Sequence, residues 1–206
     1  MNELIVTDIN KVINMSDGEF YNNFAYIMQV ALVRDVSLYT DLIDEMYEIC
    51  ERKEDVLEDV LNRANKNRQL ILDQASLKEG QVNPLSFGYP IAEGLKSVMQ
   101  DKFNPGEYLS LGCVAAGYIS WQKNWLTKDE YYELRDMFVP FYLPISVEMI
   151  DIDAVTKAIV DGLTANEDSH YTLALLKKIG KTVIDKTVSE DDIKAAIDEL
   201  NFDEAW

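Results

Sequence analysis

Histidine and cysteine are almost missing from this sequence, which has one His and two Cys in 206 residues. Cys50 and Cys113 do not form a CxxC pair, and His170 has no second histidine to join it, so a Cys/His zinc site lacks its ligands. Glycine-rich phosphate-binding loops of the GxGxxG or GxxxxGK[ST] type are also absent. We interpret the two cysteines as buried thiols and His170 as a surface residue in front of a strand.

Positive charge is scarce as well. The chain has 19 Lys and Arg against 37 Asp and Glu, a formal net charge of −18. Nucleic acids and anionic membrane surfaces would repel such a chain, so we expect neither as a partner. We interpret the excess of acidic residues as a feature that favours solubility. Binding of a basic protein partner is the more specific alternative. The acidic group Asp161, Glu167 and Asp168 is typical of a solvated loop, with a weak divalent-cation site as the alternative.

Long apolar runs are missing too, because no stretch approaches the 18 residues of a membrane span. The first residues lack the basic and apolar regions of a signal peptide. With free thiols expected, these features predict a cytoplasmic protein.

Hydrophobic residues make up 48% of the chain, enough for one sizeable core, and no repeat or long linker divides it. We therefore expect residues 1–206 to form a single, mainly α-helical domain. Apolar spacing and N-caps predict helices that start near Ser16, Thr127, Asp151 and Ser189, a helix containing residues 38–49, a long charged helix over 53–74, and helices beginning at Pro90 and Pro105. Residues 4–8 are predicted to be extended and residues 75–88 to form a loop. Residues 171–176 and 182–184 are predicted to be two short strands or extended pieces.

The helix after Pro105 is the most apolar segment. Its small residues, Gly112, Ala115, Ala116 and Gly117, allow close packing, so we expect it at the centre of the bundle.

Four segments in order carry a resemblance to a known family. Residues 87–94 (FGYPIAEG) are similar to a paired-histidine metal motif, and residues 105–107 (PGE) with the apolar helix that follows are similar to a histidine-glycine-glutamate segment. Residues 19–35 resemble a helix that carries a metal glutamate, and residues 179–181 (IGK) resemble a closing segment. Together they resemble the C-terminal, metal-binding domain of 3-dehydroquinate synthases over about Leu4 to Leu200. The resemblance implies a helical bundle with at most a small two-stranded β element near 171–184.

The resemblance places the family's zinc ligands, one glutamate and two histidines, at Tyr26, Tyr89 and Pro105. Tyrosine is a poor zinc ligand near neutral pH because the pKa of its phenol is about 10. Proline has no side-chain donor atom. We therefore expect no metal at this site.

The positions that contact substrate in the family also differ. They correspond to Gln29, Asn67, Ser86 and Glu93. An anionic phosphate substrate would lose positive partners and be repelled by Glu93. The family's chemistry uses NAD held by an N-terminal α/β domain, and this chain begins where that domain would end, so we expect no cofactor.

These observations favour a catalytically inactive dehydroquinate synthase-like domain, a pseudoenzyme with a binding or scaffolding role. One alternative is the helical half of a split 3-dehydroquinate synthase-type enzyme that acts with a separate NAD-binding chain. Another is a small-ligand binding protein whose cleft, lined by Tyr26, Tyr89 and Glu93, takes a cationic or neutral polar ligand. For a partner we expect an unidentified protein or a second copy, with Trp121 and Trp125 as the candidate aromatic anchors on one helical face.

Overall fold

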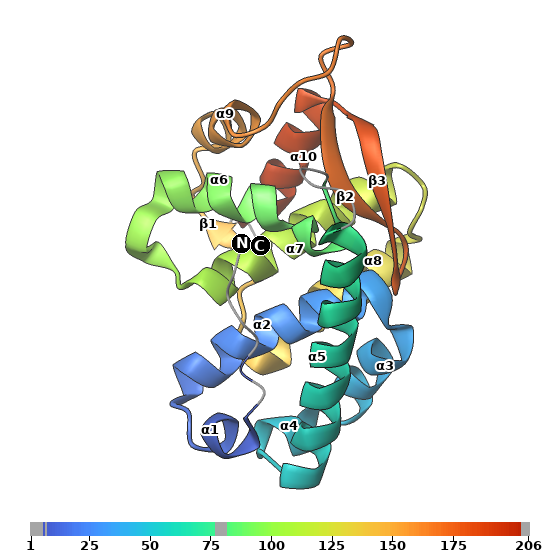
Figure 1. The fold of residues 1–206 in the computed structure, drawn as a ribbon. Coiled ribbons are helices and arrows are strands. Elements are labelled where there is room, and N and C mark those ends of the chain that lie inside the picture. The colour runs from blue at the N-terminus through green and yellow to red at the C-terminus, as the bar shows by residue number, and fades with distance from the viewer. Residues whose placement is uncertain (1–5, 7, 77–81, 203–206) are drawn as a thin grey trace.

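Helices dominate the computed structural model, which describes residue 6, residues 8–76 and residues 82–202 (Figure 1). In chain order the α-helices are α1 (Ile9–Ile13), α2 (Asp17–Arg34), α3 (Val36–Asp44), α4 (Met46–Cys50), α5 (Glu54–Ser76), α6 (Tyr89–Met99), α7 (Pro105–Gln122), α8 (Lys128–Asp136), α9 (Ile152–Asp161) and α10 (Glu190–Leu200). Three short 3₁₀ helices are η1 (Pro84–Ser86), η2 (Gln100–Lys102) and η3 (Val139–Phe141). The predicted mainly α fold is confirmed, while most of the extended segment predicted at 4–8 lies outside the described residues.

The helix starts follow local capping chemistry. Capping boxes begin α2, α8 and α10, where Ser16, Thr127 and Ser189 exchange hydrogen bonds with the residue three positions on. The single helix predicted around 38–49 is wrong, because the chain leaves helical geometry at Glu45 (φ −105°, ψ 15°) and forms α3 and α4 instead. Helix α1 was not predicted, since five residues are too few to show a helical period.

Helix α7 crosses the middle of the molecule, between the end formed by α1–α5 and the end formed by α6, α9, α10 and the hairpin (Figure 1). Every residue from Tyr108 to Ser120 except Tyr118 is buried. It packs against α2, α6, α8, α10 and β2 (Tyr171–Lys178). The predicted central position of this helix is confirmed.

Glycines let the start of α6 approach α7 at backbone distance. A Cβ on Gly112 would lie 2.1 Å from the Gly88 carbonyl oxygen, and a Cβ on Gly88 would lie 2.5 Å from the backbone nitrogen of Cys113. Gly88 also has φ +75°, a conformation that favours glycine. This contact fixes the position of the next residue, Tyr89, which is the first residue of α6.

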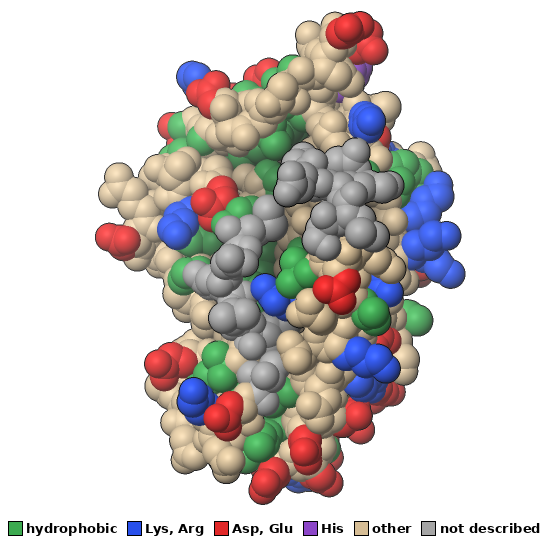
Figure 2. All heavy atoms as spheres, in the orientation of Figure 1, with side chains coloured by type: hydrophobic (Ala, Val, Ile, Leu, Met, Phe, Trp, Pro, Cys, Tyr) green, Lys and Arg blue, Asp and Glu red, His purple; other side chains and the backbone are tan. Residues whose placement is uncertain are grey.

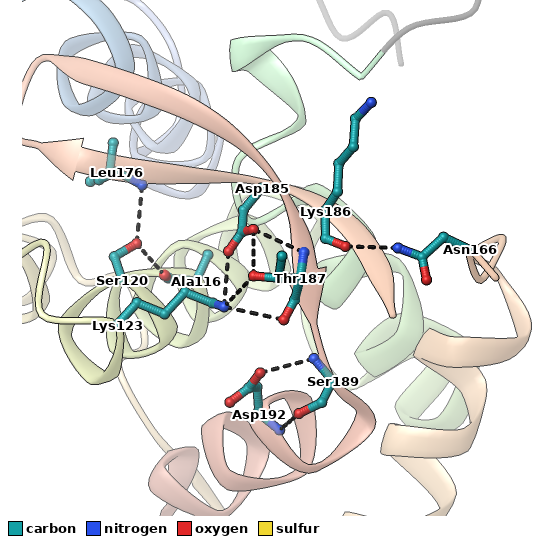
Figure 3. A network of polar contacts seen from close by, with 10 residues as sticks. All are labelled: Ala116, Ser120, Lys123, Asn166, Leu176, Asp185, Lys186, Thr187, Ser189 and Asp192. Carbon is teal, nitrogen blue, oxygen red and sulfur yellow. Dashed lines mark hydrogen bonds and ion pairs between the residues drawn. The ribbon is translucent and has the colours of Figure 1, made fainter. Parts of the chain in front are cut away.

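Strands β2 and β3 (Lys181–Val188) form an antiparallel hairpin, with Ala174 opposite Ile184, and this confirms the predicted two-stranded β element near 171–184. A polar network ties the hairpin to the end of α7 (Figure 3). Lys123 Nζ lies 2.9 Å from Asp185 Oδ2, and Asp185 Oδ1 accepts hydrogen bonds from the backbone N–H and hydroxyl of Thr187.

A second pair, β1 (Val147–Glu148) and β4 (Asn201–Phe202), runs parallel and was not predicted. Two residues per strand are too few to show an alternating pattern. Within the described chain, no helix combines the length and apolar character that a membrane span needs.

Candidate functional site

A cavity of about 300 Å³ lies between α2, α5, η1, α6 and the first turns of α7. It is lined by Tyr26, Gln29, Val30, Arg68, Leu72, Asn83, Leu85, Tyr89, Ala92, Glu93, Lys96, Pro105, Tyr108 and Leu109. Five of the seven residues singled out in the sequence share this lining, although they lie far apart along the chain.

Three of the five are the residues predicted at former metal-ligand positions. Tyr26 comes from the middle of α2, Tyr89 is the first residue of α6, and Pro105 is the first residue of α7. The two tyrosines are half-buried, and they line the cavity without filling it. The structure therefore gathers the three positions around one space.

Gln29 links two elements of the cavity wall. Its side chain is 5% exposed, and Nε2 donates hydrogen bonds to the carbonyl oxygens of Leu85 and Phe87, at 3.0 and 2.7 Å. These bonds hold the η1–α6 connection against α2. The position where the resemblance expects a substrate-contacting lysine thus stabilises the fold.

Ser86 and Asn67 do not line the cavity. Ser86 is buried in η1, where its hydroxyl accepts a hydrogen bond from the Asn83 N–H. Asn67 Nδ2 donates to Asp35 Oδ2 at 2.7 Å and to the Arg63 carbonyl oxygen at 3.1 Å, so it supports the N-cap of α3. The structure does not bring these two predicted substrate positions together with the other five.

Arg68 and Lys96 line the cavity but were not singled out in the sequence. Arg68 follows Asn67 directly on α5, and the helical turn points the next residue in another direction. Lys96 lies three residues after Glu93 on α6, one helical turn along the same face. This i, i+3 spacing could have predicted from the sequence that Lys96 lines the cavity. Whether Arg68 lines it depends on how α5 packs.

Comparison with known proteins identifies the family. Residues 23–162 match the model described as 3-dehydroquinate synthase C-terminal. The chain belongs to this family. It is 26% identical over 198 residues to a 3-dehydroquinate synthase of Coxiella burnetii (strain Dugway 5J108-111), a match that covers 94% of this chain and 55% of the relative. A 3-dehydroquinate synthase of Dehalococcoides mccartyi (strain CBDB1) is 21% identical, with 96% and 55% covered.

Solved structures show the same fold. The chain superposes with a TM-score of 0.82 and 20% identity on 2-epi-5-epi-valiolone synthase from Streptomyces hygroscopicus subsp. jinggangensis 5008, solved with NAD⁺ and Zn²⁺ bound, covering 94% of this chain and 54% of that one. A 2-deoxy-scyllo-inosose synthase complexed with carbaglucose-6-phosphate, NAD⁺ and Co²⁺ matches with a TM-score of 0.73 and 18% identity, with 93% and 55% covered. The chain spans about half the length of the relatives it matches.

The donor atoms around the cavity do not suit the zinc of a dehydroquinate synthase-like domain. Zinc in proteins takes thiolate, imidazole and carboxylate ligands, whereas the three positions to which the resemblance assigns the ligands hold two phenols and a proline ring. Within the described residues, no three His, Cys, Asp or Glu side chains come together as a metal site requires. His170 lies just before β2, where its backbone N–H donates a hydrogen bond to Asn166 Oδ1. The cavity therefore lacks the chemistry to hold zinc as the resemblance would place it.

The start of α7 is also closed to anions. Pro105 has no N–H, the Gly106 N–H donates to Asn22 Oδ1 at 2.7 Å, and the Glu107 N–H donates to Asn104 Oδ1 at 3.1 Å. A helix N-terminus binds anions through unpaired N–H groups. Here protein side chains already occupy the groups that the first turn presents.

Tyr108 adds an uncharged wall to the cavity. Burial raises the pKa of its phenol, and its hydroxyl donates to the Gln100 carbonyl oxygen at 2.7 Å. The Tyr108 side chain is 2% exposed and stays neutral across the physiological range.

A second hollow of about 600 Å³ shares Tyr26 and Pro105 with the cavity. Its other lining residues include Asn22, Asn23 and Asn104. Tyr26 and Pro105 therefore stand between the two spaces.

The predicted aromatic face of Trp121 and Trp125 is wrong in one respect. Trp121 lies on α7 and stacks on Tyr131, with ring centroids 5.2 Å apart, whereas Trp125 lies beyond the helix end. Lys177 Nζ sits 5.0 Å from the Trp125 ring centroid. The two rings do not form one helical face because α7 ends at Gln122.

Acidic side chains are scattered over the face seen in Figure 2, with Lys and Arg among them. Asp161 pairs with Lys157 at 2.5 Å on α9, and Glu167 and Asp168 are exposed. The solvated-loop interpretation of that acidic group agrees with these surroundings.

Proposed function

We propose that this chain is a catalytically inactive member of the dehydroquinate synthase C-terminal family, which keeps the fold for a binding or scaffolding role. One observation carries the proposal. Tyr26, Tyr89 and Pro105, to which the resemblance assigns the family's metal-ligand positions, line a single cavity, and none offers an imidazole or a carboxylate. A domain built this way lacks the Lewis acid that its relatives' chemistry would use there.

Two neighbouring residues support the same conclusion. Gln29 and Ser86 occupy positions that the resemblance assigns to substrate binding, yet both make hydrogen bonds within the fold. These side chains therefore stabilise the helical domain at positions where, by the resemblance, catalysis would need substrate contacts. The proposal treats residues 1–206 as one domain, supported by a hydrophobic cluster that extends from α2 to α10.

Metal analysis and an activity assay on the purified full chain test this proposal. After incubation with Zn²⁺ and dialysis, we expect far less than about one zinc per chain, the stoichiometry of a built site. We also expect no 3-dehydroquinate synthase turnover, either alone or with an added NAD-binding half of an active relative. The intact Coxiella burnetii relative is the positive control for both measurements. Stoichiometric zinc, or turnover in either assay, contradicts the proposal.

An open cavity favours a second candidate within the same proposal, small-ligand binding. About 300 Å³ of space remains between the helices, enough for a small metabolite. The cationic or neutral ligand predicted from Tyr26, Tyr89 and Glu93 needs revision, because Arg68 and Lys96 line the same space.

A further inference from the structure

Arg68 is exceptional among the five arginines of the chain. The other four each have a partner: Arg34 with Gln74, Arg52 with Asp17, Arg63 with Asp41, and Arg135 with Asp136. Arg68 makes no hydrogen bond or ion pair within the described part of the chain, although 37 acidic residues are available. It is half-buried and lines the cavity. A planar guanidinium left in this way has its donors available for a bidentate anion.

Two charges stand on the α6 side of the cavity, across from α5. Glu93 and Lys96 are both exposed lining residues, three positions apart. Among the described residues neither forms an ion pair, with the other or with any other side chain. The cavity therefore presents two cations and one carboxylate whose charges are not neutralised by ion pairs with other described residues.

The rest of the lining suits a short carbon chain. Val30, Leu72 and Leu109 supply apolar surface, and Tyr26 and Tyr89 supply phenol rings. The volume of about 300 Å³ is at the small end of ligand pockets. A compact metabolite fits these dimensions, and a dinucleotide does not.

We propose that the cavity binds a small amino-bearing dianion, in which Arg68 and Lys96 hold the two negative charges, carried by two carboxylates or by one phosphate, and Glu93 holds the ammonium. Acidic amino acids and phosphorylated small amines share this chemistry. The inference rests on the proposed function, because the ligand is held by side chains in a site without metal. It changes the ligand class, since Glu93 selects for an amine where the resemblance has a histidine.

Isothermal titration of the full chain tests the ligand class with four probes: L-glutamate, glutarate, O-phosphoethanolamine and inorganic phosphate. Glutarate carries the two carboxylates of glutamate without its amine. We expect glutamate or phosphoethanolamine to bind, and the better of the two identifies the carboxylate or the phosphate source. An ammonium paired with Glu93 should make glutamate or phosphoethanolamine at least about tenfold tighter than glutarate or phosphate, respectively.

Two variants assign the roles. Arg68→Met should abolish binding of the preferred probe, and Glu93→Gln should reduce its preference over the amine-free probe to near unity. Lys66→Met and Glu58→Gln are the matched controls for Arg68→Met and Glu93→Gln, respectively. Lys66 and Glu58 are exposed on α5 and lie outside the cavity, and each control changes the net charge as its test variant does. Both controls should bind as the parent does, and circular dichroism should report the same helix content in all variants.

The inference is overturned if neither amine-bearing probe binds, if the amine-free probes bind equally well, or if Arg68→Met binds like Lys66→Met. Zinc content and turnover, measured on the same preparation, report on the proposed function separately. Absent ligand binding with absent zinc and turnover would remove only the ligand inference. Bound zinc or turnover would remove the proposed function whatever the titration gives.

Discussion

The side-chain nitrogen of Gln29 lies 2.7 Å from the carbonyl oxygen of Phe87 and donates a hydrogen bond to it. The same nitrogen reaches the Leu85 carbonyl oxygen, so one buried amide serves two backbone acceptors. Gln29→Leu would remove this donor from both oxygens; its bond to the Phe87 oxygen is buried and its bond to the Leu85 oxygen is partly buried. We expect the free energy of unfolding to fall by about 2–4 kcal/mol, measured by urea denaturation. Gln69→Leu is the control, because Gln69 is exposed and, among the described residues, bonds only to Asp73; the substitution should change stability by less than about 0.5 kcal/mol.

Backbone contact between α6 and α7 gives a second prediction. Gly112→Ala puts a Cβ 2.1 Å from the Gly88 carbonyl oxygen, so the two helices must separate. We expect a loss of at least about 2 kcal/mol in unfolding free energy. Gly18→Ala on α2 has nothing within 4 Å and should instead stabilise by about 0.5–1 kcal/mol. Equal effects of the two substitutions would contradict the close approach.

The ion pair that ties the hairpin to α7 predicts a pH dependence. Burial alone would raise the pKa of Asp185, but hydrogen bonds from Lys123 and Thr187 outweigh it and hold the pKa below its usual value. A carboxyl whose pKa is lower in the folded state than in the unfolded state stabilises the fold at pH values above the unfolded pKa of about 3.9. This stabilisation is lost as the pH falls through the folded-state pKa. Lys123→Met should therefore cost about 2–3 kcal/mol at pH 7, and this cost should shrink below about pH 4 as Asp185 is protonated. Chemical denaturation of parent and variant at pH 7, 5, 4 and 3 measures it. A cost that stays constant down to pH 3 would show that packing of Lys123, rather than its charge, stabilises the hairpin.

Restoring the replaced ligands tests whether Tyr26, Tyr89 and Pro105 are correctly assigned. A triple variant, Tyr26→Glu with Tyr89→His and Pro105→His, provides one carboxylate and two imidazoles around the cavity. We expect it to bind about one zinc per chain, as three protein ligands with an open position do. Elemental analysis after dialysis measures this, and the single variant Tyr26→Glu should stay metal-free. Zinc in the triple variant no higher than in the single one would show that the three positions do not converge on one ion.

Local chemistry made much of the fold predictable. Ser16 and Glu19 predict the start of α2, because the two partners of a capping box are only three residues apart in the sequence. The apolar run after Pro105 predicts a central helix in the same way, since burial on all sides leaves no polar face. The boundary between α3 and α4 was not predictable, because Glu45 is an ordinary helix former in a helical pattern.

Tertiary packing decided what the sequence left open in the site. Asn67 and Arg68 are neighbours, yet Asn67 bonds to Asp35 while Arg68 lines the cavity. Which of the two reaches the cavity depends on how α5 is rotated against α2, and residue type does not fix that rotation. The resemblance predicted that Tyr26, Tyr89 and Pro105 belong to one site. That the charged side chains of Arg68 and Lys96 line the same cavity is visible only in the structure.

The placement of Tyr26 between two hollows has a consequence for access. The residue lines both a cavity of about 300 Å³ and a hollow of about 600 Å³. Shortening this one side chain to alanine would open a passage from one space to the other beside Pro105. In that variant small molecules would then enter and leave by two routes, so we expect the Tyr26 side chain to separate the two spaces in this chain.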